Sequence, residues 1–291
     1  MHKFTNTMNI LIADSGSTKT AWILLSEGAE PKEYVTSGIN PNFNTVDEMA
    51  DIIRDGLMDV INGASIGFVY FYGTGCGPES RKKKVKAALQ LCFFDALIEV
   101  NTDLLAAARA CLGNEAGVAC ILGTGSNTCL YDGEKIIKGV PSMGFALADE
   151  GSGGDFGKKI LNSYFYELMP EELRNWLDEN FDMRLESVLD AVYIKPRPNK
   201  YVAGFTRLIG EFHEHEFVRA MVRDGFIEFV EKQVGYLGDL TGQKVGFVGT
   251  IASIHRDILE EVLQQKGMIL GDIVRGPIDE LADYHLKLIY K

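Results

Sequence analysis

No apolar run in the chain approaches the roughly 20 residues that a membrane-spanning helix needs. Residues 1–7 also lack the apolar core of a signal peptide, and a second methionine, Met8, stands directly before the first strand-like run. We therefore expect residues 1–7 to be a disordered leader or the result of a misplaced start, and we expect no membrane partner.

Cysteine is scarce and irregularly spaced. The five cysteines form neither a CxxC pair nor a Cys/His ligand spacing, and their odd number argues against a disulfide framework. Three of them lie within apolar stretches, where a free cysteine behaves as a small hydrophobic residue. A reducing cytoplasm is the expected compartment. The cysteines are Cys76, Cys92, Cys111, Cys120 and Cys129.

Positive charge is in deficit. The 29 basic residues face 41 acidic residues, which gives a net charge of −12. Nucleic-acid phosphates would be repelled by such a surface, so no nucleic-acid partner is expected. The one basic run, Arg81–Lys84, fits a solvated helix face. A length of 291 residues suits two domains better than one core.

Two short polar segments, Asp14–Thr20 and Gly123–Thr128, look like versions of each other. Each lies between two apolar runs, a pattern that predicts a β-hairpin. Glycine lets the backbone approach a ligand, and the neighbouring N–H and hydroxyl groups can donate to phosphate oxygens. We therefore expect one polyphosphate to be bound from both sides, by Ser15, Gly16, Ser17, Thr18, Lys19 and Thr20 and by Gly123, Thr124, Gly125 and Ser126.

Simpler explanations exist for each hairpin taken alone. A Gly-Ser-Thr cluster between strands is most often only a turn. A Walker P-loop is excluded, because that loop opens a helix, whereas the first segment here opens a strand-like run that contains Trp22 and Ile23. A dinucleotide-binding fingerprint fails for the same reason.

A third segment, Val245–Ser253, predicts a strand that ends at Gly249 and Thr250 and is followed by a helix. Gly249 leaves room where a flat ring could lie. The order of the three segments resembles the phosphate-one, phosphate-two and adenosine motifs of the actin-like ATPases. That superfamily includes sugar kinases, actin and the seventy-kilodalton chaperones.

The stretch around Gly144–Phe145 and Asp149–Gly153 narrows this resemblance to the N-acetylglucosamine kinase and BadF/BadG/BcrA/BcrD-type ATPase family. The resemblance extends from Met8 to the end of the chain. It implies an α/β fold of duplicated actin-like ATPase (ribonuclease H-like) domains, each a mixed sheet flanked by helices, with an interdomain cleft. It also implies ATP and Mg²⁺ as cofactors.

The pattern of apolar runs supports two α/β halves. Residues 8–106 give three strands, then alternating helices and strands, and residues 107–275 begin the same pattern again. Residues 153–238 are expected to be mostly helical. By resemblance, residues 276–291 form a helix that packs back on the N-terminal domain, and hinges lie near residues 104–112 and 274–277.

Two aspartates end strands of the first half. Asp14 could hold Mg²⁺ beside the nucleotide phosphates, or it could simply hydrogen-bond its own turn. Asp103 opens a helix and could be its N-cap, or it could be the general base that takes a proton from a sugar hydroxyl. The resembling kinases have their catalytic aspartate at this point in the order, which favours the base.

The sugar-side candidates come from several loops. In the resembling kinases the Asp of the Asp-Glu-Gly segment binds sugar hydroxyls, which implies this role for Asp149. Asn40 and Asn42 offer amides beside a proline turn, and Gly73 and Thr74 follow a strand-like run. The segment at Gly73–Gly75 departs from the Ser-Gly-rich form of the animal sugar kinases, which puts the identity of the sugar in doubt. The candidates are Asn40, Asn42, Gly73, Thr74, Thr124, Gly144 and Asp149.

The resemblance implies an ATP-dependent kinase that acts on an amino sugar, with N-acetylglucosamine and its 6-phosphate as the expected pair. Two alternatives stay open. One is a BadF/BadG-type ATPase that activates a partner redox enzyme through an iron–sulfur cluster, for which Cys76 is the one loop cysteine. The other is a regulator that binds nucleotide or sugar without turnover. A homodimer is also left open.

Overall fold

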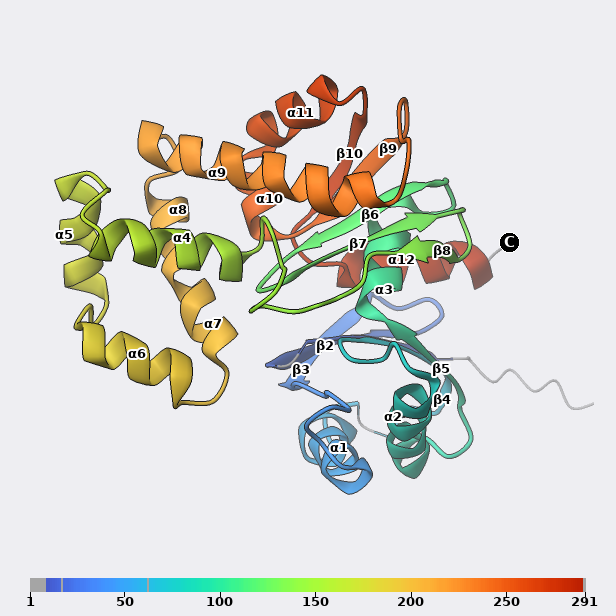
Figure 1. Cartoon of the computed structure of the whole chain (residues 1–291). Helices are drawn as coiled ribbons and strands as arrows, with labels where there is room; N and C mark the ends of the chain where they lie inside the picture. The colour runs from blue at the N-terminus through green and yellow to red at the C-terminus, as the bar shows by residue number, and fades with distance from the viewer. Residues whose placement is uncertain (1–8, 17, 62, 290–291) are drawn as a thin grey trace, which may run out of the picture. The chain divides into compact units, whose positions relative to one another are not determined.

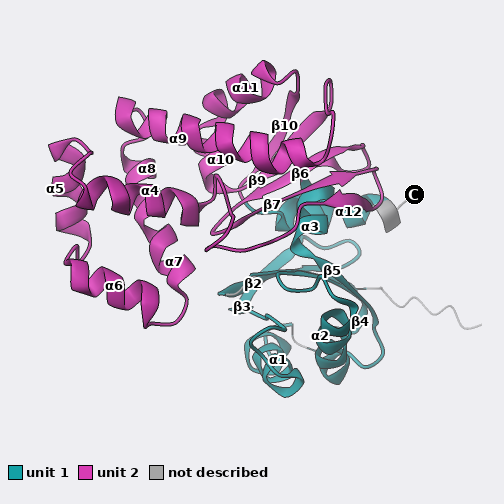
Figure 2. Ribbon diagram, viewed as in Figure 1, with its two compact units in different colours: residues 1–110, 276–291 teal, residues 111–275 magenta. Residues whose placement is uncertain are grey.

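The computed structural model describes residues 9–16, 18–61 and 63–289 (Figure 1). The expected leader, residues 1–7, and Ser17 of the first hairpin lie outside the described residues. The chain divides into two compact units; the first boundary falls within the helix Asp103–Leu112, and the second lies between the strand Ile269–Val274 and the helix Ile278–Ile289. Unit 1 comprises residues 1–110 and 276–291, and unit 2 comprises residues 111–275 (Figure 2).

Unit 1 is built on a five-stranded mixed sheet. The first three strands form the predicted antiparallel meander, and the last two run parallel to the first strand. The order across the sheet is β3-β2-β1-β4-β5. The strands are β1 (Asn9–Ser15), β2 (Lys19–Leu25), β3 (Lys32–Ser37), β4 (Ile66–Gly73) and β5 (Leu97–Thr102).

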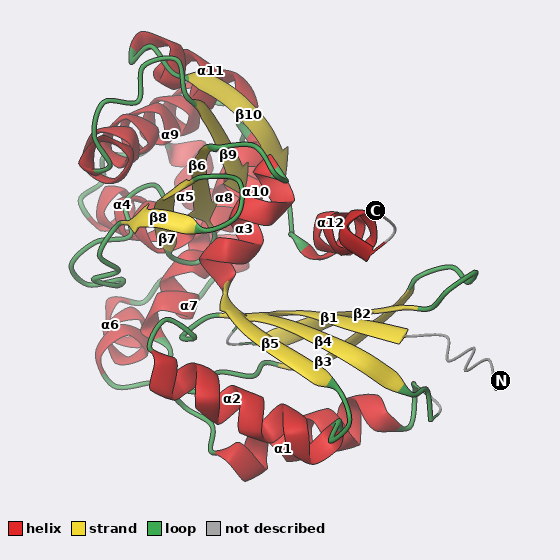
Figure 3. Cartoon of the chain, turned by 90° about the vertical axis from the view of Figure 1, so that its right-hand side faces the viewer, coloured by secondary structure: helices red, strands yellow, loops and turns green. Residues whose placement is uncertain are grey.

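Helices cover both faces of this sheet. In Figure 3, α1 and α2 lie on one face and α12 lies on the other. The core under α1 and α2 includes Trp22 and Phe71, and the core under α12 includes Ile12 and Ile23. The helices are α1 (Val46–Ile53), followed by a π-helical turn (Arg54–Met58), α2 (Glu79–Cys92), α3 (Asp103–Leu112) and α12 (Ile278–Ile289).

Unit 2 repeats the topology of unit 1. Its sheet has the order β10-β9-β6-β7-β8, with an antiparallel meander followed by two strands parallel to the first. The prediction of a duplicated α/β fold with a mixed sheet in each half is confirmed. The strands are β6 (Gly117–Leu122), β7 (Ser126–Tyr131), β8 (Ile136–Gly139), β9 (Lys244–Val248) and β10 (Ile269–Val274).

The long insertion between β8 and β9 is helical, as its composition predicts. In Figure 1, α5 and α6 lie at the side of unit 2 farthest from its sheet. The insertion contains α4 (Gly153–Phe165), α5 (Glu171–Asn180), α6 (Leu185–Tyr193), α7 (Pro198–Ala203), a 3₁₀ turn (Gly204–Thr206), α8 (Arg207–Glu211), α9 (Glu216–Phe229) and a π-helical turn (Val230–Val234). Two further helices, α10 (Thr250–Ile254) and α11 (Arg256–Gln265), lie between β9 and β10.

A buried cluster of hydrogen-bonded side chains joins three elements of unit 1. The Tyr72 hydroxyl of β4 lies 2.8 Å from Nε2 of His285 on α12, and Arg109 of α3 donates to the same hydroxyl. Because arginine only donates, the phenol proton goes to Nε2, which leaves the His285 proton on Nδ1. Burial, followed by the charge of Arg109, lowers the pKa of His285 to about 3, so this histidine is neutral near pH 7. The neutral imidazole also stacks on Tyr70, with ring centroids 3.8 Å apart.

Candidate functional site

The first hairpin joins β1 to β2. The hydroxyl oxygens of Ser15 and Thr20 lie 2.7 Å apart and are buried, and the Ser15 hydroxyl also contacts the backbone of Ile39. Ser15 therefore holds the hairpin to the segment that follows β3, and the Thr20 hydroxyl donates to the carbonyl of Ser37 at the end of β3. Thr18 and Lys19 are exposed at the turn. Of the predicted phosphate ligands in this hairpin that the structure describes, these two side chains are the ones open to a ligand.

Three parallel strands of unit 1 end at the same edge of the sheet. Ser15 of β1 pairs with Gly73 of β4, and Gly73 pairs with Thr102 of β5. This register brings the residues just before or after these positions close together, namely Asp14, Thr74 and Asp103. The carboxyl edge of parallel strands is the usual place for ligand-binding groups in α/β sheets.

The charge of Asp103 acts on the carboxyl group of Asp14. Burial is the largest cause that raises the pKa of Asp14 to about 6, and the charge of Asp103 is the next. Lys19 partly opposes the shift. A pair of half-buried carboxylates is stabilised by a cation, and oxygen ligands are those that Mg²⁺ prefers. The chemistry of this donor pair therefore fits the predicted Mg²⁺ near Asp14.

Asp103 is held at both carboxylate oxygens. The Thr74 hydroxyl donates to Oδ2 at 2.8 Å, and the Leu104 N–H donates to Oδ1 at 2.9 Å. Burial raises the pKa of Asp103, and these hydrogen bonds lower it again by a smaller amount. The first turn of α3 is capped by Thr102, whose hydroxyl accepts from the Leu105 N–H at 3.2 Å. The capping function is therefore provided by the residue before Asp103.

The Asn40–Asn44 turn lies against the loop that follows β4. Asn40 is buried, and its side-chain oxygen accepts the Asn42 N–H at 2.9 Å, so it builds the turn. Asn42 is exposed. A Cβ on Gly75 would come within 2.8 Å of the Asn42 amide nitrogen and 2.9 Å of the Asn40 oxygen. Asn42 and Thr74 thus lie in neighbouring loops of unit 1, and Asn42 is the more accessible of the two asparagines.

The second hairpin, between β6 and β7, is held by the start of α4. The carbonyls of Gly123 and Thr124 accept the N–H groups of Gly153 and Gly154 at 2.8 and 2.9 Å. These two N–H groups at the start of α4 therefore hold the hairpin turn in place. The turn residues Gly123 and Thr124 are exposed.

Asp149 lies against the same hairpin. The N–H of Ser126 donates to Oδ1 of Asp149 at 3.3 Å, and a Cβ on Gly125 would come within 2.8 Å of Oδ2. Asp149 has φ +68° in the left-handed region, and its side chain is only 8% exposed. Burial raises its pKa. Gly144 begins the same loop, also with a positive φ, of +74°.

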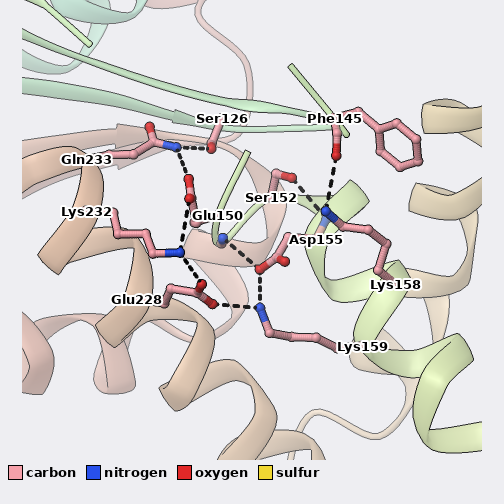
Figure 4. Close-up of polar contacts among 11 residues, drawn as sticks. Ser126, Phe145, Glu150, Ser152, Asp155, Lys158, Lys159, Glu228, Lys232 and Gln233 are labelled. Atoms are coloured by element: carbon pink, nitrogen blue, oxygen red, sulfur yellow. Dashed lines mark hydrogen bonds and ion pairs between the residues drawn. The ribbon is translucent and has the colours of Figure 1, made fainter. Parts of the chain in front are cut away.

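A polar network that the sequence did not reveal lies beside Asp149 (Figure 4). Gln233, from the π-helical turn after α9, donates through Nε2 to Ser126 Oγ at 2.7 Å and to Glu150 at 3.0 Å. Its Oε1 accepts from the Thr128 hydroxyl at 3.3 Å. A π-helical turn shifts the side chains that follow it relative to an α-helix, so helical periodicity alone gives no signal that Gln233 faces the hairpin.

From Glu150 the network extends through a chain of ion pairs in which acidic and basic side chains alternate. Lys232 pairs with Glu150 at 3.4 Å and with Glu228 at 2.7 Å, and Glu228 also pairs with Lys159 at 3.1 Å. Figure 4 shows Lys159 contacting Asp155 as well. The network therefore ties the Asp149–Glu150 loop to α4 and to the end of α9.

The backbone conformation at position 249, and the closeness of a neighbouring strand, both require glycine there. Its φ is +147°, and a Cβ there would come within 2.0 Å of the carbonyl oxygen of Leu122. This close approach joins the end of β9 to the end of β6. Thr250, the other adenosine-side candidate, is exposed at the start of α10.

The cysteines and the wider donor set add two observations. Burial raises the pKa of Cys76 to about 12, which disfavours the thiolate that a cluster ligand requires. Within residues 9–16, 18–61 and 63–289, no three His, Cys, Asp or Glu side chains group as a metal site of their own.

Over the same residues, no helix is both long and apolar enough to span a bilayer.

Gly249→Ala and Gly16→Ala should behave differently. At Gly249 the new Cβ meets backbone and the φ is unfavourable, so we expect unfolding free energy to fall by more than about 3 kcal/mol. At Gly16 the nearest atom to a Cβ is 3.8 Å away, so stability should stay within about 1 kcal/mol. Urea denaturation checks both values. Equal stability of the two variants would contradict the structural role of Gly249.

Comparison with solved structures finds a close match along almost the whole chain. A protein from Porphyromonas gingivalis, described as a putative N-acetylglucosamine kinase, is 36% identical with a TM-score of 0.88, and the match covers 96% of this chain and 99% of that one. A Chromobacterium violaceum protein of the same description is 16% identical, with coverage of 96% and 99% and a TM-score of 0.65.

A more distant match indicates the fold alone. The ROK hexokinase of Thermus thermophilus is 14% identical, with coverage of 97% and 100% and a TM-score of 0.52. No protein-family model matches the chain, and no curated protein does.

Proposed function

Because the chain belongs to the N-acetylglucosamine kinase family of the actin-like ATPases, we propose that it transfers the γ-phosphoryl group of ATP to a hydroxyl of an amino sugar. The observation that carries the proposal is the arrangement of Asp14, Thr74 and Asp103 at one edge of the unit 1 sheet. The description of the Porphyromonas relative supports N-acetylglucosamine as the substrate, and we propose its 6-phosphate as the product.

Asp103 is the proposed general base. It accepts a proton from the sugar hydroxyl as that hydroxyl attacks the γ-phosphorus. A base works best when its pKa approaches the working pH, and burial moves the pKa of Asp103 in that direction. Its hydrogen bonds from Thr74 and Leu104 fix the carboxylate before the substrate arrives.

Asp14 is the proposed Mg²⁺ ligand, directly or through water. Bound Mg²⁺ would neutralise charge on the phosphate oxygens. The exposed groups of the first hairpin, Thr18 and Lys19, and the exposed turn of the second, Gly123 and Thr124, are the proposed phosphate contacts.

Gly249 and Thr250 are proposed for the adenosine side. Asp149 is the proposed ligand of the sugar hydroxyls, since a carboxylate can accept two hydrogen bonds at once. Asn42 is proposed as a further sugar ligand, while Asn40 supports it from the buried side of the turn.

Coupled ADP release tests the proposal directly. The panel consists of N-acetylglucosamine, glucosamine, glucose, N-acetylmannosamine and anhydro-muramic acid, with Mg²⁺ and ATP. We expect the highest kcat/KM for N-acetylglucosamine. Sugar-independent ATP hydrolysis, or no ADP release with any sugar, would overturn the proposed activity.

Asp103→Asn separates binding from chemistry in the same assay. Asparagine keeps the size and can still hydrogen-bond, but it cannot accept the proton. We expect kcat to fall by about 10² to 10⁴, while KM for sugar and ATP changes only a few-fold. Asp14→Asn is the matched variant, and it should instead weaken the dependence on Mg²⁺. A variant Asp103→Asn with most of the normal kcat would mean that the base lies elsewhere.

Thr74→Val should move the pH profile. The base acts when deprotonated, so activity is lost as the pH falls through the pKa of Asp103. The Thr74 hydrogen bond lowers that pKa, so its removal should shift the acidic limb of kcat/KM to higher pH by about one unit. Thr74→Ser, which restores the donor, should return the limb to its original position. An unmoved limb in Thr74→Val would argue against this hydrogen bond in the active enzyme.

A further inference from the structure

Unit 2 contains a cavity of about 230 Å³ beside Asp149. The lining residues come from the start of β7, from residues 140–143 and 148–150, and from the π-helical turn after α9 together with Tyr236. Of the lining residues, the sequence singled out Asp149 as a sugar ligand and Ser126 as a phosphate ligand, and the others were not chosen from the sequence. Because Asp149 lines the cavity, a substituent next to sugar hydroxyls that Asp149 binds would lie close to it.

The outer walls are mainly apolar. Val140, Pro141 and Met143 form one side, and Tyr236 belongs to the other. Met143 is 58% exposed and Tyr236 is 48% exposed, so both offer apolar surface that a ligand could remove from water. Lys138 holds Tyr236 in place, because its ammonium donates to the Tyr236 carbonyl at 2.7 Å and lies 4.4 Å from the ring centroid.

The floor is polar and already organised. Both donors of the Gln233 amide are in use, toward Ser126 and Glu150, and its oxygen accepts from Thr128. Gln233 is 4% exposed and cannot turn toward a ligand without breaking these bonds. The floor therefore keeps its shape, and a ligand gains affinity without a cost for ordering it.

The charge of the cavity is not positive. Asp149 and Glu150 contribute two carboxylates, and Lys232 is the cation among the lining residues. Lys232 is engaged by Glu150 at 3.4 Å and by Glu228 at 2.7 Å. Its charge is therefore balanced before any ligand enters, and an anionic substituent would lie close to the Asp149 carboxylate without an unengaged cation among the lining residues to offset it.

We propose that this cavity is the specificity pocket for the N-acyl substituent of the amino sugar, that it accepts uncharged acyl groups larger than acetyl, and that it disfavours a substituent bearing a carboxylate. The inference rests on the proposed sugar-binding role of Asp149. Apolar walls match the alkyl part of the acyl group, while the polar floor matches the sugar ring next to it. The volume exceeds what a single methyl group fills, because one water-sized site needs only about 10 to 15 Å³.

The test compares four sugars by ADP release and by calorimetric binding: glucose, N-acetylglucosamine, N-butyrylglucosamine and N-succinylglucosamine, whose acyl group ends in a carboxylate. We expect N-butyrylglucosamine to keep a kcat/KM within about tenfold of that of N-acetylglucosamine, and we expect the kcat/KM of N-succinylglucosamine to be lower by more than about tenfold. A strong preference for the carboxylate-bearing sugar, or rejection of the butyryl group, would overturn the proposal.

Met143→Ala tests whether the apolar side of the cavity contacts the acyl group. We expect KM for N-butyrylglucosamine to rise about tenfold, with KM for glucose unchanged, since glucose has no substituent for the pocket. Leu147→Ala is the matched control, because Leu147 is 75% exposed in the same loop and does not line the cavity. Equal effects of the two variants, or an equal loss for glucose, would overturn the pocket.

Met143→Lys tests the charge argument by gain of function. An added ammonium that Glu150 and Glu228 do not already bind should raise kcat/KM for N-succinylglucosamine relative to N-acetylglucosamine. An unchanged ratio would contradict the electrostatic part of the proposal.

Binding and turnover together distinguish the two levels of inference. If no sugar releases ADP but N-acyl sugars bind the wild type more tightly than Met143→Ala, the proposed activity fails and the pocket stands. If N-acetylglucosamine is phosphorylated but Met143→Ala matches Leu147→Ala, the pocket fails and the activity stands. If neither binding nor ADP release is seen, both fail.

Discussion

The register of three parallel strands in unit 1 is the constraint on which its candidate site depends. Because β1, β4 and β5 pair in parallel, their carboxyl ends align, and residues separated by some 30 or more positions in the chain become neighbours. The charge of Asp103 then raises the pKa of Asp14, and the Thr74 hydroxyl donates to Asp103. A one-residue slip of β5 would turn its side chains to the opposite face of the sheet and remove this juxtaposition.

The duplicated topology uses its two hairpins in different ways. In unit 1 the hydroxyls of Ser15 and Thr20 face each other and hold the segment after β3. In unit 2 the corresponding polar start of β7, Ser126, is held by Gln233, which comes from the helical insertion. The same sheet order therefore supports a self-contained hairpin in one unit and a hairpin braced by added helices in the other.

The sequence predicted the strands, the helical insertion and the duplication, because apolar periodicity and glycine-rich turns are local signals. It also singled out Asp14 and Asp103 by their places at strand ends. It could not identify Gln233, since a π-helical turn breaks the periodicity that would orient it. It could not separate Thr102 from Asp103 as the helix cap, and it gave no sign of the contact between Tyr72 and His285, which are 213 positions apart.

The contact between Tyr72 and His285 has a consequence for synthesis of the chain. The face of the unit 1 sheet that carries Ile10, Ile12 and Ile23 packs with α12, which emerges from the ribosome only after all of unit 2. At ordinary elongation rates, roughly 5–20 residues per second, this apolar face stays uncovered on the order of ten seconds before α12 has been synthesised. Unit 2 is contiguous and can fold during that interval. The nascent chain should therefore be most exposed to chaperones, and to aggregation, through its earliest-made sheet.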